Sequence, residues 1–187
     1  MGRLELIIGP MYAGKSTELL RIVNRYKCLG KKVLAINHCI NKRYGGNSKE
    51  ITTHDNKKLN GCLDMEYLAS LFENKYIEKF EEADVIIIEE LQFFSDALEI
   101  VTKCVDKYDK ILVCAGLDGD YKREPFGDIL YLIPYAEKVT KLTALCKRCG
   151  DGTLAAFTKR YTNKNNDKVL VGGAESYEAV CRKHYLE

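Results

Sequence analysis

An eight-residue stretch near the amino terminus has the G-x-x-x-x-G-K-S pattern of a phosphate-binding loop. Its residues are Gly9, Pro10, Met11, Tyr12, Ala13, Gly14, Lys15 and Ser16. Such a loop turns its backbone N–H groups toward phosphate oxygens, at the positive end of the helix that follows. Lys15 can then reach the β- and γ-phosphates of a nucleotide, and the Ser16 hydroxyl can coordinate Mg²⁺. The alternative is a glycine-rich turn that binds nothing.

The elements around this loop are those that the pattern requires. The apolar run 4–8 before it is typical of a buried strand, and residues 18–26 after it have apolar side chains at helical spacing. Similar Val- and Ile-rich runs lie at 33–37, 85–88 and 111–115, with helical patterns at 17–29, about 65–80 and 97–105. Buried strands that alternate with helices predict an α/β fold with a doubly wound, mostly parallel sheet of the P-loop (RecA-like) class.

Two carboxylates, Glu89 and Glu90, follow the apolar run 85–88. An acid at a strand end beside a phosphate loop can hold Mg²⁺, directly or through water. A second acid can act as general base on an acceptor hydroxyl. Because consecutive side chains of an extended chain point to opposite sides, we expect the two acids to have different roles. A solvated strand end is the alternative to this phosphoryl-transfer site.

Four soft metal ligands occur as two hooks near the carboxyl terminus, Cys146-x-x-Cys149 and Cys181-x-x-His184. Two such hooks complete a tetrahedron, which predicts a closed, structural Zn²⁺ site of the Cys₃His type. Disulfides or free thiols are the alternative, but three cysteines cannot all pair among themselves.

The length and composition limit the classes of protein to which this chain can belong. The 187 residues are 46% hydrophobic and 30% charged with a net charge of +2, which favours one large domain with a small appendage. This near-neutral charge argues against nucleic acid as a partner. The sequence also has no apolar run of 18 residues, the length that would predict a membrane segment. The helical pattern fades near residue 145, so we expect a nucleotide-binding domain over 1–142 and a zinc-binding domain over 143–187. Eight scattered cysteines beside an ATP-type loop favour a reducing, cytoplasmic location.

The order and spacing of the motifs closely resemble those of the type II thymidine kinases over essentially the whole chain. Besides the phosphate loop and the Cys/His hooks, the matching segments are 42–44 (K-R-Y), 53–55 (T-H-D), 88–94 (I-E-E-L-Q-F-F), 117–127, 158–160 (T-K-R) and 171–177. The resemblance implies transfer of the γ-phosphoryl group of ATP to the 5′-hydroxyl of thymidine, with deoxyuridine as a possible acceptor and with Mg²⁺. It makes Glu90 the catalytic base and Glu89 a partner of the metal, with Arg43 and Gln92 on the phosphate side.

The same resemblance implies a nucleoside pocket built largely by a zinc-anchored lasso loop in the domain 143–187, which we call the lasso domain. Its implied residues are Met11, Phe93, Tyr121, Thr158, Lys168, Val169, Leu170, Val171, Gly172 and Tyr177. A flat, uncharged pyrimidine suits aromatic and apolar walls with a few fixed polar groups. The family also implies a homotetramer and feedback inhibition by thymidine triphosphate (dTTP).

The chain departs from the family pattern at three positions. Glu89 stands where Asp is usual, Leu91 replaces a small residue and is expected to crowd the nucleotide side, and His184 replaces the commoner Cys. Two other functions are compatible with parts of the sequence. One is a P-loop ATPase whose zinc ribbon acts on nucleic acid, and the other is a nucleotide-binding module without catalysis.

Overall fold

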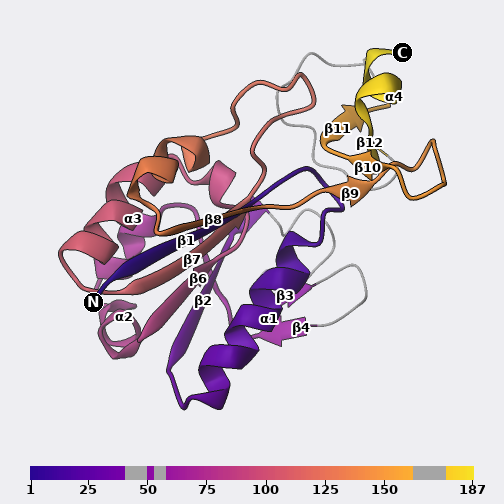
Figure 1. Ribbon diagram of the computed structural model, residues 1–187. Coiled ribbons are helices and arrows are strands. Elements are labelled where there is room, and N and C mark those ends of the chain that lie inside the picture. The colour runs from indigo at the N-terminus through magenta and orange to yellow at the C-terminus, as the bar shows by residue number, and fades with distance from the viewer. Residues whose placement is uncertain (41–49, 53–57, 162–175) are drawn as a thin grey trace.

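The centre of the molecule is a six-stranded sheet in which every neighbouring pair is parallel (Figure 1). The computed structural model describes residues 1–40, 50–52, 58–161 and 176–187. In spatial order the strands are β5 (Leu63–Met65), β2 (Val33–His38), β6 (Val85–Ile88), β7 (Ile111–Gly116), β1 (Arg3–Ile8) and β8 (Lys138–Lys141). The four strands predicted from apolar runs form the middle of this sheet, which confirms the doubly wound α/β fold.

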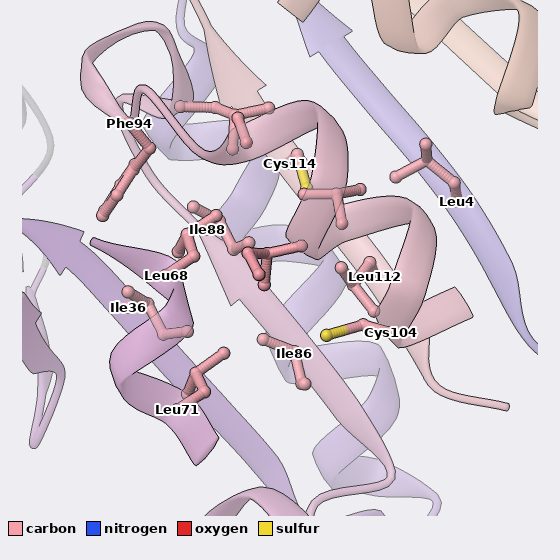
Figure 2. Packing of buried hydrophobic residues seen from close by; sticks show 14 of the residues in the cluster. Leu4, Ile36, Leu68, Leu71, Ile86, Ile88, Phe94, Cys104, Leu112 and Cys114 are labelled. Carbon is pink, nitrogen blue, oxygen red and sulfur yellow. The ribbon is translucent and has the colours of Figure 1, made fainter. Parts of the chain in front are cut away.

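Both faces of the sheet are covered, which explains why its central strands are apolar at consecutive positions. Ile86 and Ile88 pack into the core on one face, whereas Val85 and Ile87 belong to the core on the other. The first face is covered by η2 (Leu68–Phe72), α2 (Ile77–Glu82), α3 (Ala97–Asp106) and η4 (Ile129–Tyr135), and the second by α1 (Lys15–Cys28) with the hairpin β3 (Glu50–Thr52) and β4 (Lys58–Asn60). Figure 2 shows the first core, where Cys104 and Cys114 pack among aliphatic side chains.

The helix predicted over about 65–80 is wrong. The chain there forms β5, then the short 3-10 helix η2, then α2. Its apolar side chains do recur at helical spacing, but residues 63–65 pair with the exposed edge of β2. The Asp96 carboxylate then accepts hydrogen bonds from the N–H groups of Leu68 and Ala69, which fixes the start of η2. Tertiary partners have therefore divided a segment that is helical by its own periodicity.

The two edge strands, β5 and β8, have no continuous apolar run. Residues 138–141 of β8 are mostly exposed, and Val139 has 39% of its surface accessible. β5 has only three residues, and its buried Leu63 and Met65 alternate with Asp64. Neither edge strand therefore has the continuous apolar run that predicts the central strands.

The described residues of the carboxyl-terminal part form short antiparallel pairs and one short helix. Strand β9 (Ala144–Leu145) pairs with β10 (Leu154–Ala155), and β11 (Phe157–Arg160) pairs with β12 (Tyr177–Val180), which leads into α4 (Arg182–Leu186). The predicted boundary at residue 142 lies between β8 and β9, and the division into two domains stays a prediction.

No helix among the described residues is both long enough and apolar enough to cross a membrane.

Candidate active site and metal centre

The predicted phosphate loop connects the end of β1 to the start of α1. Gly9 has φ 150° and packs so closely that a Cβ there would lie 2.4 Å from the carbonyl oxygen of Leu142. Only glycine fits this position. The Lys15 ammonium folds over the loop and donates a hydrogen bond of 2.8 Å to the carbonyl of Pro10. The loop thus has the turn and the lysine placement that a phosphate site needs.

The carboxylate of Glu89 lies directly against the end of this loop. It is buried, and its Oε1 accepts a 2.6 Å hydrogen bond from the Ser16 hydroxyl. Its Oε2 is buried without a hydrogen-bond partner among the described residues. Burial raises the pKa of Glu89 to about 7, and the Glu90 charge adds to this rise against the opposing effects of Ser16 and Lys15. A hydroxyl beside an unsatisfied carboxylate oxygen fits the hard oxygen ligands that Mg²⁺ takes.

Glu90 is not part of an extended chain. Its φ of 55° and ψ of 42° place it in the left-handed region, so the expected alternation of Glu89 and Glu90 across a strand is wrong. The β6 strand ends at Ile88, and the chain turns at Glu90 into the short helix η3 (Leu91–Phe93). A left-handed non-glycine residue costs free energy and is held only by its surroundings.

Gln92 stabilises the left-handed conformation of Glu90 through two hydrogen bonds of its side-chain amide. Its Nε2 donates a 2.5 Å hydrogen bond to Glu90 Oε2, and its Oε1 accepts one of 3.0 Å from the backbone N–H of Leu117. Gly127 approaches from the other side, where a Cβ would lie 2.2 Å from the Gln92 carbonyl oxygen. The buried amide of Gln92 therefore connects the Glu90 carboxylate to the end of the neighbouring strand β7.

Three carboxylates attract the charge of the Lys15 ammonium. Burial lowers the pKa of Lys15, while attraction to Glu90, Glu89 and Asp118 opposes that fall. Asp118 also forms an ion pair with Lys141, with an N–O distance of 2.7 Å. Sequence reasoning missed Asp118, although it follows a buried strand just as Glu89 does. The carboxyl ends of β6 and β7 thus place both acids beside the loop.

The phosphate loop also contacts the carboxyl-terminal strands β11 and β12 directly. The backbone N–H of Met11 donates a 3.0 Å hydrogen bond to Thr158 Oγ1, and the Tyr12 hydroxyl donates one of 3.4 Å to the Tyr177 carbonyl. Four of the predicted site residues therefore meet at one junction between the loop, β11 and β12.

The other two aromatic residues predicted for the pocket, Phe93 and Tyr121, contact different side chains from each other. The Phe93 ring packs edge-on against Phe126 at 5.4 Å between centroids and lies 5.7 Å from the His38 ring. Tyr121 lies in the loop after β7, with the Arg160 guanidinium 5.2 Å from its ring. His38 is buried at the end of β2 against Phe93, a contact that its position in the sequence did not reveal.

The two Cys/His hooks converge on one point. The ligand atoms of Cys146, Cys149, Cys181 and His184 all lie within 4.8 Å of one another. The Cys149 and Cys181 sulfurs are 3.8 Å apart, and His184 Nδ1 lies 3.4 Å from each of them. Tetrahedral zinc with Zn–S bonds of about 2.3 Å places its sulfur ligands about 3.8 Å apart. The spacing and the soft donor set therefore fit Zn²⁺.

Comparison with known proteins gives the family. The family model described as "Thymidine kinase" matches residues 2–185. This chain belongs to the thymidine kinase family. The thymidine kinase of Oryza sativa subsp. japonica is 44% identical over 187 residues, 100% of this chain and 67% of that protein. The thymidine kinase of vaccinia virus (strain Western Reserve) is 38% identical over 186 residues, 100% of this chain and 98% of that protein. The resemblance drawn from the motifs is confirmed.

The similarity to solved structures is weaker than the similarity to these relatives. DnaA from Aquifex aeolicus, bound to AMPPCP, has a TM-score of 0.45 and 14% identity, over 76% of this chain and 41% of that chain.

Leu91 is fully buried in the core with Ile88 and Phe94. The expectation that it crowds the nucleotide side stays a prediction. The predictions for Arg43 and for the lasso residues Lys168, Val169, Leu170, Val171 and Gly172 lie outside the described residues.

Proposed function

We propose that this member of the thymidine kinase family transfers the γ-phosphoryl group of ATP to the 5′-hydroxyl of thymidine, and more slowly to deoxyuridine. The observation that supports it most strongly is the Glu90 carboxylate, which Gln92 holds beside the phosphate loop while it attracts Lys15. Phosphoryl transfer requires an aligned acceptor and neutralised charge, and little covalent chemistry from the protein.

Each part of the site has a role in this proposal. The N–H groups of residues 9–16 and the Lys15 ammonium bind the phosphates, with Arg43 and Gln92 on the same side. Ser16 and Glu89 hold Mg²⁺, which neutralises charge on the phosphoryl oxygens when it is bound. Glu90 orients the 5′-hydroxyl and takes its proton.

The nucleoside lies, in this proposal, between the phosphate loop and the lasso domain. Met11 and Thr158 support it from the junction where they are hydrogen-bonded to each other. Phe93, Tyr121 and Tyr177 form aromatic walls, and the backbone of 168–172 binds the edge of the base. Zn²⁺ at Cys146, Cys149, Cys181 and His184 keeps this wall in place before the nucleoside arrives, which reduces the entropic cost of binding.

We also propose, from family membership, a homotetramer with dTTP as a feedback inhibitor at the nucleoside site. All eight cysteines lie within the described residues, and none of them is paired in a disulfide. Three of them are needed as zinc ligands, so we place the enzyme in the reducing cytoplasm.

A panel of nucleosides tests the proposed function. With ATP and Mg²⁺, we expect thymidine to be phosphorylated fastest, deoxyuridine more slowly and deoxycytidine not measurably. Product nucleotides are separated by chromatography, and ADP release is followed without acceptor and with single-stranded DNA. ATP hydrolysis that depends on DNA, with no nucleoside product, would instead support a nucleic-acid ATPase.

We predict that binding of Mg²⁺ and ATP releases a proton from Glu89. A carboxylate binds a metal only when deprotonated, and burial raises the pKa of Glu89 to about 7. The proton release that accompanies binding should therefore be large at about pH 6 and almost zero above about pH 8. Because the folded pKa exceeds the ordinary 4.5, the contribution of Glu89 to stability is present at low pH and is lost as pH rises through about 7.

Calorimetry in buffers of different ionisation enthalpy measures this proton. Glu89→Gln cannot release it and serves as the reference. Equal proton release by the wild type and Glu89→Gln at low pH would contradict the assignment.

A further inference from the structure

The helix α4 connects the zinc cluster to a loop that lies far away in sequence. His184 is a predicted zinc ligand, and the next residue, Tyr185, donates a 2.8 Å hydrogen bond from its hydroxyl to the carbonyl oxygen of Tyr121. In Figure 1 the loop between β7 and η4 rises from the sheet toward β11 and α4. The contact joins residues 64 positions apart.

The Tyr185 ring is held on several sides. The Arg123 guanidinium lies 4.4 Å from its centroid, and the Phe157 ring of β11 lies 5.4 Å away. Lys159, also in β11, donates hydrogen bonds to the backbone carbonyls of His184 (2.8 Å) and Tyr185 (3.3 Å). Arg123 itself has φ 66°, so the loop adopts a costly conformation exactly where it meets α4. The contact is therefore a packed cation–π and hydrogen-bonded junction.

Within the loop, the bonds around Asp120 make a compact turn. Asp120 Oδ1 accepts hydrogen bonds from the N–H groups of Lys122 (2.8 Å) and Glu124 (3.0 Å). The N–H of Asp120 donates to the Glu124 carbonyl, and that of Arg123 to the Asp120 carbonyl. These local bonds shape the turn, and outside contacts hold it over the site and limit its local opening. The Tyr185 hydroxyl makes such a contact at Tyr121.

We propose that Tyr185 is a positioning residue that transmits the geometry of the zinc site to Tyr121. The inference rests on the proposed function, which places Tyr121 in the wall of the nucleoside pocket. The zinc then orders the loop 118–127 as well as the strands β9–β12 around the cluster. Tyr185 does not touch the reacting atoms in this arrangement, so its loss affects nucleoside binding more than phosphate binding.

Tyr185→Phe removes only the hydroxyl and keeps the ring that Arg123 and Phe157 contact. We expect zinc content equal to that of the wild type and faster hydrogen exchange at the amides of residues 120–124. The KM for thymidine should rise about three- to tenfold, as for loss of one hydrogen bond, with the KM for ATP unchanged. Tyr131→Phe makes the same chemical change at an exposed tyrosine of η4 and should match the wild type.

Removal of zinc from the wild-type protein by a chelator gives a second measurement that needs no variant to fold. Exchange at 120–124 should rise, and chelation of Tyr185→Phe should add little further. Unchanged exchange at 120–124 in both experiments would overturn the inference, as would equal changes in the KM values for thymidine and ATP. If the wild type fails to phosphorylate thymidine while the exchange results hold, the proposed function fails and the zinc-to-loop coupling stands.

Discussion

Glu90→Gln should lower kcat for thymidine phosphorylation by about 10²- to 10⁴-fold, the usual contribution of a general base. Glutamine has nearly the same shape and can still hydrogen-bond to the Gln92 amide, which now holds Glu90 at 2.5 Å. It cannot accept the proton of the acceptor hydroxyl. Because the phosphate loop and Glu89 are untouched, the affinity for ATP should stay close to that of the wild type.

Single-turnover kinetics and a separate ATP-binding measurement check this result. Glu78→Gln, at an exposed glutamate of α2, is the matched control and should leave both quantities unchanged. Near-normal turnover by Glu90→Gln would remove Glu90 from the role of base. Loss of ATP binding in the same variant would instead assign it to the nucleotide site.

Cys149→Ser should lower zinc affinity by about 100-fold or more, since loss of a group that only orients a ligand already costs 10- to 100-fold. The Cys149 sulfur lies 3.8 Å from that of Cys181 and 3.4 Å from His184 Nδ1, so its loss opens the cluster. Metal-binding free energy is folding free energy in small sites of this kind. We therefore expect β9–β12 to loosen and thymidine binding to fail before ATP binding does.

Elemental analysis, thermal unfolding and the separate KM values for thymidine and ATP measure this effect. Cys28→Ser changes an exposed cysteine of α1 outside the cluster and is the control. Purified wild-type protein without zinc, or a Cys149→Ser variant with unchanged thymidine KM, would contradict a structural zinc site that shapes the pocket.

The features that were predictable from sequence are those encoded at short, fixed spacing. The phosphate loop needs Gly9, Gly14, Lys15 and Ser16 in one turn, and each metal hook needs its two ligands three residues apart. The central strands are buried on both faces, so their burial appears directly as continuous apolar runs. Family resemblance then added roles that spacing alone does not assign, such as that of Glu90.

The features that only the tertiary structure decided depend on partners distant in the chain. The edge strand β8 carries no apolar run because water reaches it, and the helical pattern near 65–80 gave way to pairing of residues 63–65 with β2. The left-handed turn at Glu90 is held by Gln92, whose amide in turn needs the end of β7.

Short-range patterns in the sequence thus predicted the phosphate loop, the two metal hooks and the four central strands of the sheet. The tertiary structure decided how the two sites meet, through Met11 and Thr158 at the phosphate loop and through Tyr185 and Tyr121 at α4. The physical reason is that local patterns report backbone conformation and burial. A contact between residues 147 or 64 positions apart depends on the packing of the whole chain.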